Sequence, residues 1–540
     1  MSAQFSVAEA HEAIAASRPD DICLVFRDQR LTWRQVTDRT RRLANHLLAA
    51  GLGCRIERSE LQGHESGQSH LAIYLHNGNE YLECMVGSFK ARVAPFNVNY
   101  RYVAEELRYL LLDSRAEAVV VHSQFAPTLA EVLPELPDLR VILQVPDASG
   151  HGLLPGAVWY ENALAAAPPE RPAVDWSPDD LYILYTGGTT GMPKGVLWRN
   201  GDANVECFGG SRAETIEGVL ADATGGLQAL LAPPFMHGAG HWMSFRTWNT
   251  GGCVFVQSVP ERLDPADVWG LIERERLNFL LIVGDAFGRP LLDELDRHRY
   301  DLSCLTVLLS GGAPLSANLK DEFLAHLPTV MIVDGLGSSE AGGQLSQVSA
   351  GGGATTGTFP ISPGNHVLSA DLDRELAPGD PEIGWLAKSG RLALGYLGDA
   401  AKTARTYPVV DGVRYAVPGD RARLRADGVI ELHGRDSVTI NSGGEKIFAE
   451  EVEAAVKRHP AVYDCVVASR PSDRWGNEVV AVVRVRPDHT VTDEELLAEA
   501  ERHIARYKLP KAFVYVPEIV RSPSGKADYR WAKETASRGT

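Results

Sequence analysis

The sequence predicts an α/β protein with a large multi-lobed domain over residues 1–434 and a small α+β domain over residues 435–540. Its 540 residues are too many for one hydrophobic core and suggest roughly three or four structural units. Short apolar runs alternate with segments of helical spacing over most of the chain, which is typical of α/β layers with parallel strands. About 105 residues follow Arg435, enough for an independent small domain. We therefore expect two α/β-layered subdomains and a small β subdomain in the large domain.

The composition is that of a globular protein without a basic surface for nucleic acid or anionic membrane. Hydrophobic residues make up 44% of the chain, charged residues 23%, and the formal net charge is −17, so any bound phosphate has to be held locally. The seven cysteines are scattered and odd in number, which argues against a disulfide framework or a zinc site. The first 20 residues lack the basic start of a signal peptide, and no apolar run reaches the length of a membrane span. We expect a cytoplasmic protein with reduced cysteines.

The first elements in chain order are a small hairpin and the start of a parallel sheet. Two short strands are expected at 22–26 and 31–33, followed by a helix. A strand at 70–75, a helix at 79–91 and a strand at 118–121 come next. This order favours parallel strands joined by helices.

A glycine- and threonine-rich stretch follows the apolar run 181–184. It reads Tyr185-Thr-Gly-Gly-Thr-Thr-Gly-Met-Pro-Lys-Gly-Val196. Its glycines let the backbone approach a ligand, its threonines offer hydroxyl donors, and its lysine supplies a positive charge, which together form a phosphate cradle. The residues concerned are Thr186, Gly187, Gly188, Thr189, Thr190, Gly191 and Lys194. The alternative interpretation is a surface loop after a strand.

Further strands are expected at 229–232, 279–283, 307–310 and 330–333. Polar and small residues follow their carboxyl ends, where ligands gather in open α/β sheets. By residue type alone, His237 suits a pocket or a structural role, and Glu340 suits a magnesium ligand or a solvated acid.

The stretch 351–434 is strand-like and rich in glycine, and the C-terminal segment is a compact unit. It is expected to contain a helix at 449–457, strands at 461–467, 478–485 and 513–516, and a second helix that opens on a capping box of Thr492 and Glu495.

With these motifs in order, the chain resembles the adenylate-forming superfamily of acyl-CoA synthetases, peptide-synthetase adenylation domains and luciferases. The stretch 185–195 matches the family signature except at Gly187, where serine is usual. Other family motifs recur in the family's order over essentially the whole chain: Asn99-x-Arg101 with Glu106-Leu107, Ser310-Gly-Gly-Ala-Pro314, Gly337-Ser-Ser-Glu340, Gly419-Asp420, Gly434-Arg435, Ser442-Gly-Gly-Glu445 and Gly525-Lys526.

The resemblance implies a site for ATP with Mg²⁺. The stretch from Thr186 to Lys194 would grip the β- and γ-phosphates, and Glu340, with Ser339 in place of the usual threonine, would ligate the magnesium ion. Asp420 would bind the ribose and Arg435 the sugar or the phosphate. Gly311, Gly312 and Ala313 would wall the adenine, and Leu336 replaces the tyrosine that usually stacks on it. Asp334 and Gly335 are also expected to bind ATP.

The resemblance also implies two half-reactions separated by a domain rotation. Lys526 would stabilise the charge that builds as the carboxylate attacks the α-phosphorus, although by itself it reads as a solvated lysine. The C-terminal domain would then rotate about a hinge at Ser437 and bring Ser442, Gly443 and Gly444 to the site for thioester formation with coenzyme A. His237, Gly284 and Asp285 would line the acyl pocket.

Short strings such as 440–446 and 522–533 are similar to those of actinobacterial acyl-CoA synthetases that activate sterol side-chain acids. This implies a bulky hydrophobic acid, with a medium- or long-chain fatty acid as the alternative. Two other functions stay open: transfer of the acyl group to a carrier protein or another acceptor, and a catalytically silent nucleotide or lipid binder. Homodimers are frequent in the family, so a homodimer is an expectation.

Overall fold

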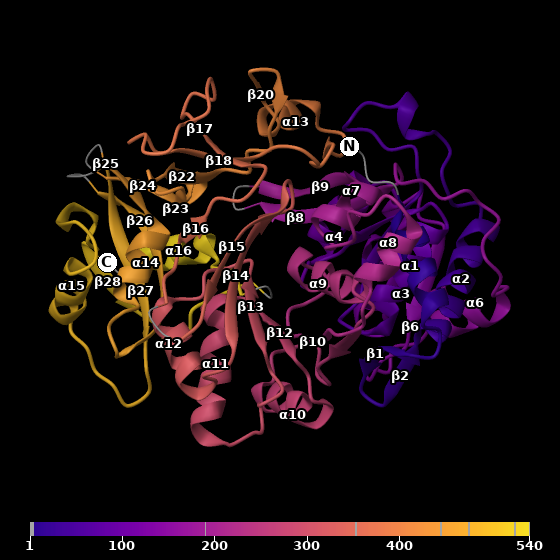
Figure 1. Cartoon of the computed structure of the whole chain (residues 1–540), viewed down its shortest axis with the longest axis horizontal. Coiled ribbons are helices and arrows are strands. Elements are labelled where there is room, and N and C mark those ends of the chain that lie inside the picture. The colour runs from indigo at the N-terminus through magenta and orange to yellow at the C-terminus, as the bar shows by residue number, and fades with distance from the viewer. Residues whose placement is uncertain are drawn as a thin grey trace.

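The computed structural model describes residues 5–188, 191–351, 354–442, 445–472, 476–522 and 525–538. Figure 1 shows a large body with a smaller C-terminal part, in yellow, at one end. The large body contains two eight-stranded sheets and a five-stranded sheet, and the small part is built on a three-stranded sheet. The α/β class and the multi-lobed arrangement predicted from the sequence are confirmed.

The first eight-stranded sheet is parallel except at one edge. Its strands run parallel from β8 to β7, whereas β9 and β19 are antiparallel. In spatial order the strands are β19 (Gly395–Tyr396), β9 (Gly191–Arg199), β8 (Leu181–Gly188), β4 (Ala94–Asn97), β3 (His70–Tyr74), β5 (Ala116–His122), β6 (Val141–Val145) and β7 (Val158–Trp159). The predicted strands near 70–75 and 118–121 are thus adjacent members of one sheet.

The second eight-stranded sheet gathers strands from distant parts of the sequence. Its spatial order is β15 (Gly342–Ser349), β14 (Met331–Ser338), β13 (Val307–Gly311), β12 (Phe279–Ile282), β10 (Gln228–Leu231), β11 (Cys253–Val256), β1 (Ile22–Phe26) and β2 (Gln29–Thr32). The hairpin β1–β2 was predicted. The parallel pairing of β1 with β11 was not, because a local sequence pattern does not indicate a pairing partner so far along the chain.

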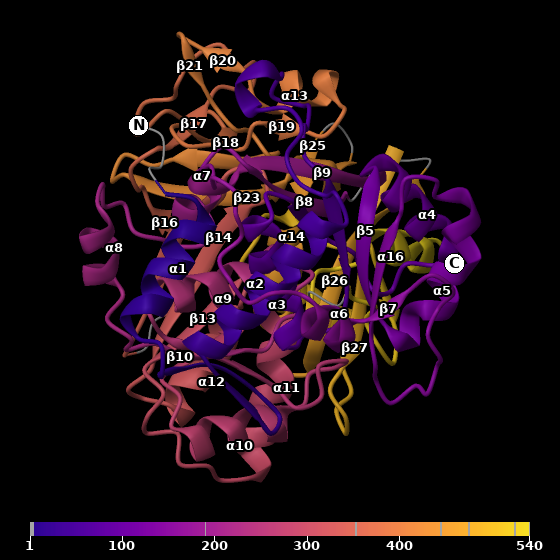
Figure 2. The ribbon, with the colours of Figure 1, turned by 90° about the vertical axis from the view of Figure 1, so that its right-hand side faces the viewer.

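Helices cover both sheets (Figure 2). The largest hydrophobic core lies between the sheets. This central layer is made by α1 (Val7–Ser17), α2 (Trp33–Ala49), α3 (Asn79–Lys90), α6 (Tyr160–Ala166) and α9 (Gly238–Asn249). The outer face of the first sheet is covered by α4 (Ala104–Asp113) and α5 (Ala126–Val132). The outer face of the second is covered by α10 (Pro265–Glu275), α11 (Gly284–Arg297) and α12 (Ala317–His326). Apolar residues on both faces of the strands make this layering stable.

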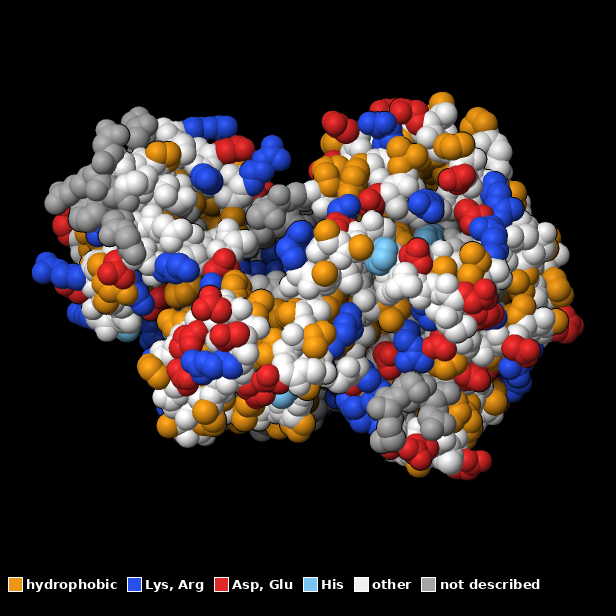
Figure 3. All heavy atoms as spheres, turned by 90° about the horizontal axis from the view of Figure 1, so that it is seen from above, with side chains coloured by type: hydrophobic (Ala, Val, Ile, Leu, Met, Phe, Trp, Pro, Cys, Tyr) orange, Lys and Arg blue, Asp and Glu red, His pale blue; other side chains and the backbone are white. Residues whose placement is uncertain are grey.

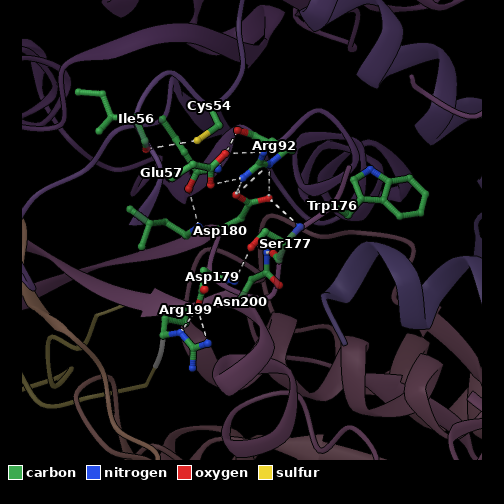
Figure 4. Close-up of polar contacts among 12 residues, drawn as sticks. Cys54, Ile56, Glu57, Arg92, Trp176, Ser177, Asp179, Asp180, Arg199 and Asn200 are labelled. Carbon is green, nitrogen blue, oxygen red and sulfur yellow. Dashed lines mark hydrogen bonds and ion pairs between the residues drawn. The ribbon is translucent and has the colours of Figure 1, made fainter. Parts of the chain in front are cut away.

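The described residues of the glycine-rich stretch belong to an antiparallel hairpin, which the sequence did not predict. Strand β8 extends to Gly188, β9 starts at Gly191, and Thr186 is opposite Lys194. A cluster of charges fixes the base of the hairpin (Figure 4). Arg92 donates to Asp180, the residue before β8, over 2.8 to 3.1 Å, and Arg199 at the end of β9 pairs with Asp179 and Asp202.

The five-stranded sheet forms the predicted β subdomain. It contains β16 (Thr358–Pro360), β23 (Val429–Arg435), β22 (Asp420–Leu424), β18 (Gly384–Lys388) and β17 (Asn365–Leu368). Its last strand ends at Arg435, at the predicted domain boundary. Smaller elements beside the large sheets are α7 (Asn200–Glu206), α8 (Ile216–Asp222), α13 (Ala400–Thr406), β20 (Val409–Val410) and β21 (Val413–Arg414).

The C-terminal part has its own sheet and cores. The sheet consists of β26 (Val462–Ser472), β27 (Gly476–Val485) and β28 (Ala512–Tyr515), with α14 (Ala449–Val456) and α15 (Asp493–Glu501) on one face and α16 (Tyr529–Arg538) on the other. The predicted capping box is confirmed: Thr492 accepts from the Glu495 amide, and the Glu495 side chain accepts from the Thr492 amide. A separate hairpin of β24 (Thr439–Ser442) and β25 (Glu445–Phe448) precedes α14.

The seven cysteines are free, as predicted. Within the described ranges, no helix combines the length and apolar character needed to cross a bilayer.

Candidate active site

Lys194 lies on β9 with its ammonium group beside acidic and aromatic side chains. Its Nζ atom is 3.3 Å from Oδ1 of Asp113, whose other oxygen accepts from the Tyr185 hydroxyl at 2.9 Å. Its side chain remains 28% exposed. This arrangement holds a partly accessible positive charge on the hairpin, as a phosphate site requires.

Glu340 is joined to the same hairpin through neighbouring elements. The Tyr396 hydroxyl donates to Oε1 of Glu340 at 2.7 Å, and Tyr396 on β19 is paired with Val196 of β9. On the other side, the indole of Trp198 donates to the carbonyl of Ser339 at 2.7 Å. The predicted magnesium ligand and the predicted phosphate-binding strands are therefore held in one unit.

The predicted adenine residues lie at adjacent strand ends. Gly311 on β13 is opposite Gly335 on β14, and a Cβ added to Gly311 would lie 3.5 Å from the carbonyl oxygen of Gly335. Gly312 has φ +90, in the left-handed region that favours glycine. Ala313 follows at the same end of the sheet.

Two side chains on β14 are engaged within the protein. The carboxylate of Asp334 pairs with the buried Lys320 ammonium, and burial raises the pKa of Asp334 while Lys320 lowers it. Leu336 packs partly against the core of the five-stranded sheet, beside residues such as Leu345 and Phe359. Contact of Leu336 with adenine stays a prediction.

Asp420 and Arg435 are opposite each other on β22 and β23. Nε of Arg435 donates to Oδ1 of Asp420 at 3.2 Å. Asp420 raises the pKa of Arg435, as do Glu340 and Glu450. The pair therefore offers a carboxylate and a guanidinium at one place.

Lys526 enters this region from the C-terminal part. It follows Gly525, whose φ is +73 and whose added Cβ would lie 3.1 Å from the carbonyl oxygen of Val283. An added Cβ at Gly312 would lie 3.9 Å from Cε of Lys526, so the lysine side chain reaches the end of β13. Desolvation by the surrounding protein and the charge of Arg435 lower the pKa of Lys526, while Glu340 and Asp420 raise it. Seen from above, the molecule is hollowed between its lobes, with Lys and Arg side chains at the hollow (Figure 3).

His237 is the residue directly before α9, in the segment that follows β10, and its side chain makes no capping hydrogen bond. Its Nε2 atom is buried and has no hydrogen-bond partner within the part of the chain that is described. Burial lowers the pKa of His237 to about 3, and the charge of Lys526 contributes to this shift. The imidazole is therefore neutral near pH 7, and it is close enough to Lys526 to respond to its charge.

Comparison with known proteins identifies the protein family. The model of the AMP-binding enzyme family matches residues 11–397, and the model of the AMP-binding enzyme C-terminal domain matches residues 451–526. The chain belongs to the AMP-binding enzyme family.

Relatives of this AMP-binding enzyme align over nearly its whole length. A medium-chain acyl-CoA ligase of Mycobacterium avium is 52% identical over 543 residues, covering 99% of each chain. A 3-oxocholest-4-en-26-oate–CoA ligase of Rhodococcus rhodochrous is 39% identical over 533 residues, covering 96% of this chain and 93% of the relative. The crystal structure of an anthranilate CoA ligase in complex with anthranoyl-AMP has a TM-score of 0.83 at 20% identity and covers 100% of this chain and 98% of its own. That likeness supports the fold assignment.

Asp285, predicted to line the acyl pocket, makes contacts at the boundary between the two parts of this AMP-binding enzyme. Its Oδ1 accepts from the amide of Ser316 at 2.7 Å, and its Oδ2 accepts from Nζ of Lys457 at 3.2 Å. Gly284 beside it has φ +51, and an added Cβ would lie 2.4 Å from the carbonyl oxygen of Pro314. Both residues therefore have evident packing roles, and their contact with an acyl group stays a prediction.

Of the predicted thioester-forming residues, Ser442 is described, and it lies apart from the strand ends. Ser442 ends β24, and the hairpin β24–β25 is at the outer edge of the C-terminal part in Figure 1. Ser437 belongs to a short 3-10 helix, Asp436–Val438, directly after β23. Thr189, Thr190, Gly443 and Gly444 lie outside the described residues.

Sequence reasoning missed the supporting tyrosine and acidic partners of the site. Tyr396 and Asp113 contact Glu340 and Lys194, respectively. Their only signals are a Gly-Tyr pair in a glycine-rich segment and an aspartate at the end of a helix, both too common to single out. Their roles depend on tertiary contacts.

Proposed function

We propose that the chain is an ATP-dependent acid–CoA ligase that forms an acyl-adenylate and then an acyl-CoA thioester. The observation that carries this proposal is the entry of Lys526 from the C-terminal part into the region of Gly312 at the end of β13. The lysine is within electrostatic reach of Glu340, Asp420 and Arg435. A positive charge at this end of the sheet would stabilise the negative charge that develops when a carboxylate attacks ATP.

In the first step, an oxygen of the substrate carboxylate attacks the α-phosphorus of ATP. A bond forms between this carboxylate oxygen and the α-phosphorus. The bond between the α-phosphorus and the oxygen that bridges to the β-phosphorus breaks, and pyrophosphate leaves with that oxygen. Lys526 would stabilise the negative charge on the transferring group, and Lys194 the charge on the β- and γ-phosphates. Asp420 would accept hydrogen bonds from the ribose hydroxyls, and Arg435 would contact the sugar or the phosphate.

The residues present fit a magnesium ion bound together with ATP. The Tyr396 hydroxyl orients the Glu340 carboxylate through a hydrogen bond to Oε1, and this carboxylate would be the protein ligand of the ion. No group of three or more His, Cys, Asp or Glu side chains that could hold a metal occurs in the described ranges. Phosphate and water oxygens would complete the coordination, as is usual for Mg²⁺. The ion would supply charge neutralisation at the leaving pyrophosphate.

In the second step, the thiolate of coenzyme A attacks the acyl carbon, forming the thioester and releasing AMP. For this step the C-terminal domain would rotate about Ser437, withdraw Lys526 and bring the loop at Ser442 to the site. His237, which is neutral near pH 7, would donate or accept a hydrogen bond near the acyl carboxylate without adding charge.

For the acid, we propose a hydrophobic carboxylate of the medium-chain or sterol side-chain class. The relative at 52% identity is named for medium-chain acids and the one at 39% for a sterol acid. The higher identity favours the medium-chain acid, whereas the sequence strings at 440–446 and 522–533 favour the sterol acid.

The test is a panel of octanoate, decanoate, palmitate and 3-oxocholest-4-en-26-oate with ATP, Mg²⁺ and coenzyme A. Release of AMP and formation of a thioester are measured with and without coenzyme A. We expect CoA-dependent AMP release with at least one acid, and the relative rates decide between the two classes. AMP release that needs a carrier protein in place of coenzyme A would favour the carrier alternative, and no AMP release with any acid would favour the silent binder.

We also propose a cytoplasmic location, as the sequence predicts, and a homodimer, as the family resemblance implies. Cell fractionation and sedimentation velocity test them.

A further inference from the structure

A line of alternating charges joins the large domain to the loop that carries Lys526. Asp285 belongs to the first turn of α11 in the large domain, and its Oδ2 accepts from Nζ of Lys457 at 3.2 Å. Lys457 directly follows α14 of the C-terminal domain. This ion pair therefore crosses from one domain to the other.

The same line continues inside the C-terminal domain. Nζ of Lys457 is 3.6 Å from Oδ1 of Asp464. Arg521 donates from Nε and Nη2 to the two oxygens of Asp464, at 2.8 and 2.7 Å. Its Nη1 donates to the carbonyl of Gly525 at 3.1 Å. Gly525 is the residue before Lys526, so four side chains connect the large domain to the backbone beside the lysine.

The four charged side chains are largely withdrawn from water. The exposed fractions are 11% for Asp285, 16% for Lys457, 13% for Asp464 and 15% for Arg521. Although burial opposes the charged form of Lys457, Asp285 and Asp464 raise its pKa above the usual value. When one partner of such a pair moves away, the charge of the other is left poorly solvated. The pair therefore favours the one arrangement of the two domains in which both charges meet.

The large domain holds Asp285 rigidly. Its Oδ1 accepts from the amide of Ser316 at 2.7 Å. The amide of Asp285 itself donates to the carbonyl of Pro314 at 3.2 Å. Both partners belong to the segment after β13, which also contains Gly312. The carboxylate that receives Lys457 is thus fixed to the same segment that Lys526 reaches.

We propose that Asp285 and Lys457 form a latch that positions Lys526 for adenylation and has to open before the C-terminal domain rotates. Through Asp464 and Arg521, the position of Lys457 fixes the position of the Gly525 carbonyl. Within this line of four side chains, Asp285–Lys457 is the pair that crosses the domain boundary, so rotation separates this pair and leaves Asp464–Arg521 intact. The proposal rests on the acid–CoA ligase function above and assigns these residues a positioning role.

The test compares the two half-reactions of Asp285→Asn. Adenylation is followed by ATP–pyrophosphate exchange with the most active acid of the panel, and thioester formation is followed from the corresponding supplied acyl-adenylate. Asparagine retains an oxygen for the Ser316 amide, so we expect the fold to persist, and thermal unfolding checks this. We expect adenylation to fall about 10- to 100-fold, with thioester formation unchanged or faster.

Asp293→Asn is the matched control. Asp293 is on the same helix, α11, and also faces the C-terminal domain, where the Tyr463 hydroxyl donates to its Oδ2 at 3.2 Å. This contact joins the same two domains but has no charged link to Gly525. We expect Asp293→Asn to leave the ratio of the two half-reactions within about twofold of wild type.

A double-mutant cycle with Lys457→Met completes the test. If Asp285 and Lys457 act as one unit, the double variant has about the same adenylation rate as the more impaired single variant. Equal losses in both half-reactions of Asp285→Asn, an unchanged adenylation rate, or additive effects in the cycle would overturn the latch. These outcomes differ from a failure of the proposed ligase function, in which the wild-type protein itself would form no acyl-adenylate with any acid.

Discussion

Replacing Arg92 by methionine is expected to destabilise the large domain more than replacing its exposed partner Glu57. Arg92 donates three hydrogen bonds to the Asp180 carboxylate. The side chains of Arg92 and Asp180 are only 15% and 4% exposed. Burial raises the pKa of Asp180, and Arg92 opposes this rise more than the Ser177 amide does. Without the guanidinium, a nearly inaccessible carboxylate loses its counter-charge.

The magnitude follows from this burial. Removing one partner of a buried pair costs about 3 to 5 kcal/mol, and the partial exposure of Arg92 favours the lower end, about 3 kcal/mol. Glu57 also pairs with Arg92, but it is 54% exposed, so Glu57→Gln should cost less than about 1 kcal/mol. The double variant Arg92→Met with Asp180→Asn should recover part of the loss, because the uncompensated charge is gone.

Urea unfolding followed by tryptophan fluorescence measures these differences, since Trp176 and Trp198 lie beside and within the hairpin. Glu57→Gln is the control for loss of a surface contact. If Arg92→Met and Glu57→Gln lowered the free energy of unfolding equally, or if Asp180→Asn gave no recovery, the assignment of the energy to the buried pair would be wrong.

Three further predictions concern the active site. Lys526→Ala should slow adenylation about 100- to 1,000-fold and spare thioester formation from supplied acyl-adenylate; equal loss in both half-reactions would contradict the two-conformation mechanism. The kcat/KM for ATP in adenylation should fall at alkaline pH, with a midpoint below the ordinary lysine pKa of 10.5. The reason is that the pKa of Lys526 is lowered and only its charged form is active in this mechanism. A kcat/KM that stays constant up to pH 10.5 would contradict this role of Lys526. Glu340→Gln should raise the Mg²⁺ concentration for half-maximal adenylation about tenfold, whereas an unchanged Mg²⁺ dependence would exclude Glu340 as a ligand.

Much of the fold could be predicted from local patterns. Strands such as β12 and β13 are short apolar runs with loop residues at both ends. The capping box of α15 is a pattern of four consecutive residues, which can be recognised in the sequence. The pairing of β1 with β11 could not be predicted, since it depends on contacts between segments about 230 residues apart. The hairpin β8–β9 was not predicted, because its glycines have low strand propensity, which cross-strand pairing overrides.

For the candidate site, the sequence could supply the residues that a family motif names, such as Lys526 and Glu340, whose roles stay predictions. The site was not predictable where a side chain acts through tertiary contacts. Asp285 illustrates this: the sequence places it after a strand and suggests a pocket, but its partner Lys457 comes from another domain. Only the folded chain shows that pairing.

The hairpin β1–β2 has a consequence for the order of folding during synthesis. Residues 22–26 are made early, yet their parallel partner in β11 spans residues 253–256. The second sheet therefore cannot be completed at this edge until more than two hundred further residues have left the ribosome, and in the interval β1 has exposed backbone donors and acceptors. In the finished protein β1 and β2 cover the edge of β11, so the N-terminal segment protects the sheet from pairing with other chains. A chain without residues 1–32 should accordingly aggregate on refolding, as light scattering would reveal.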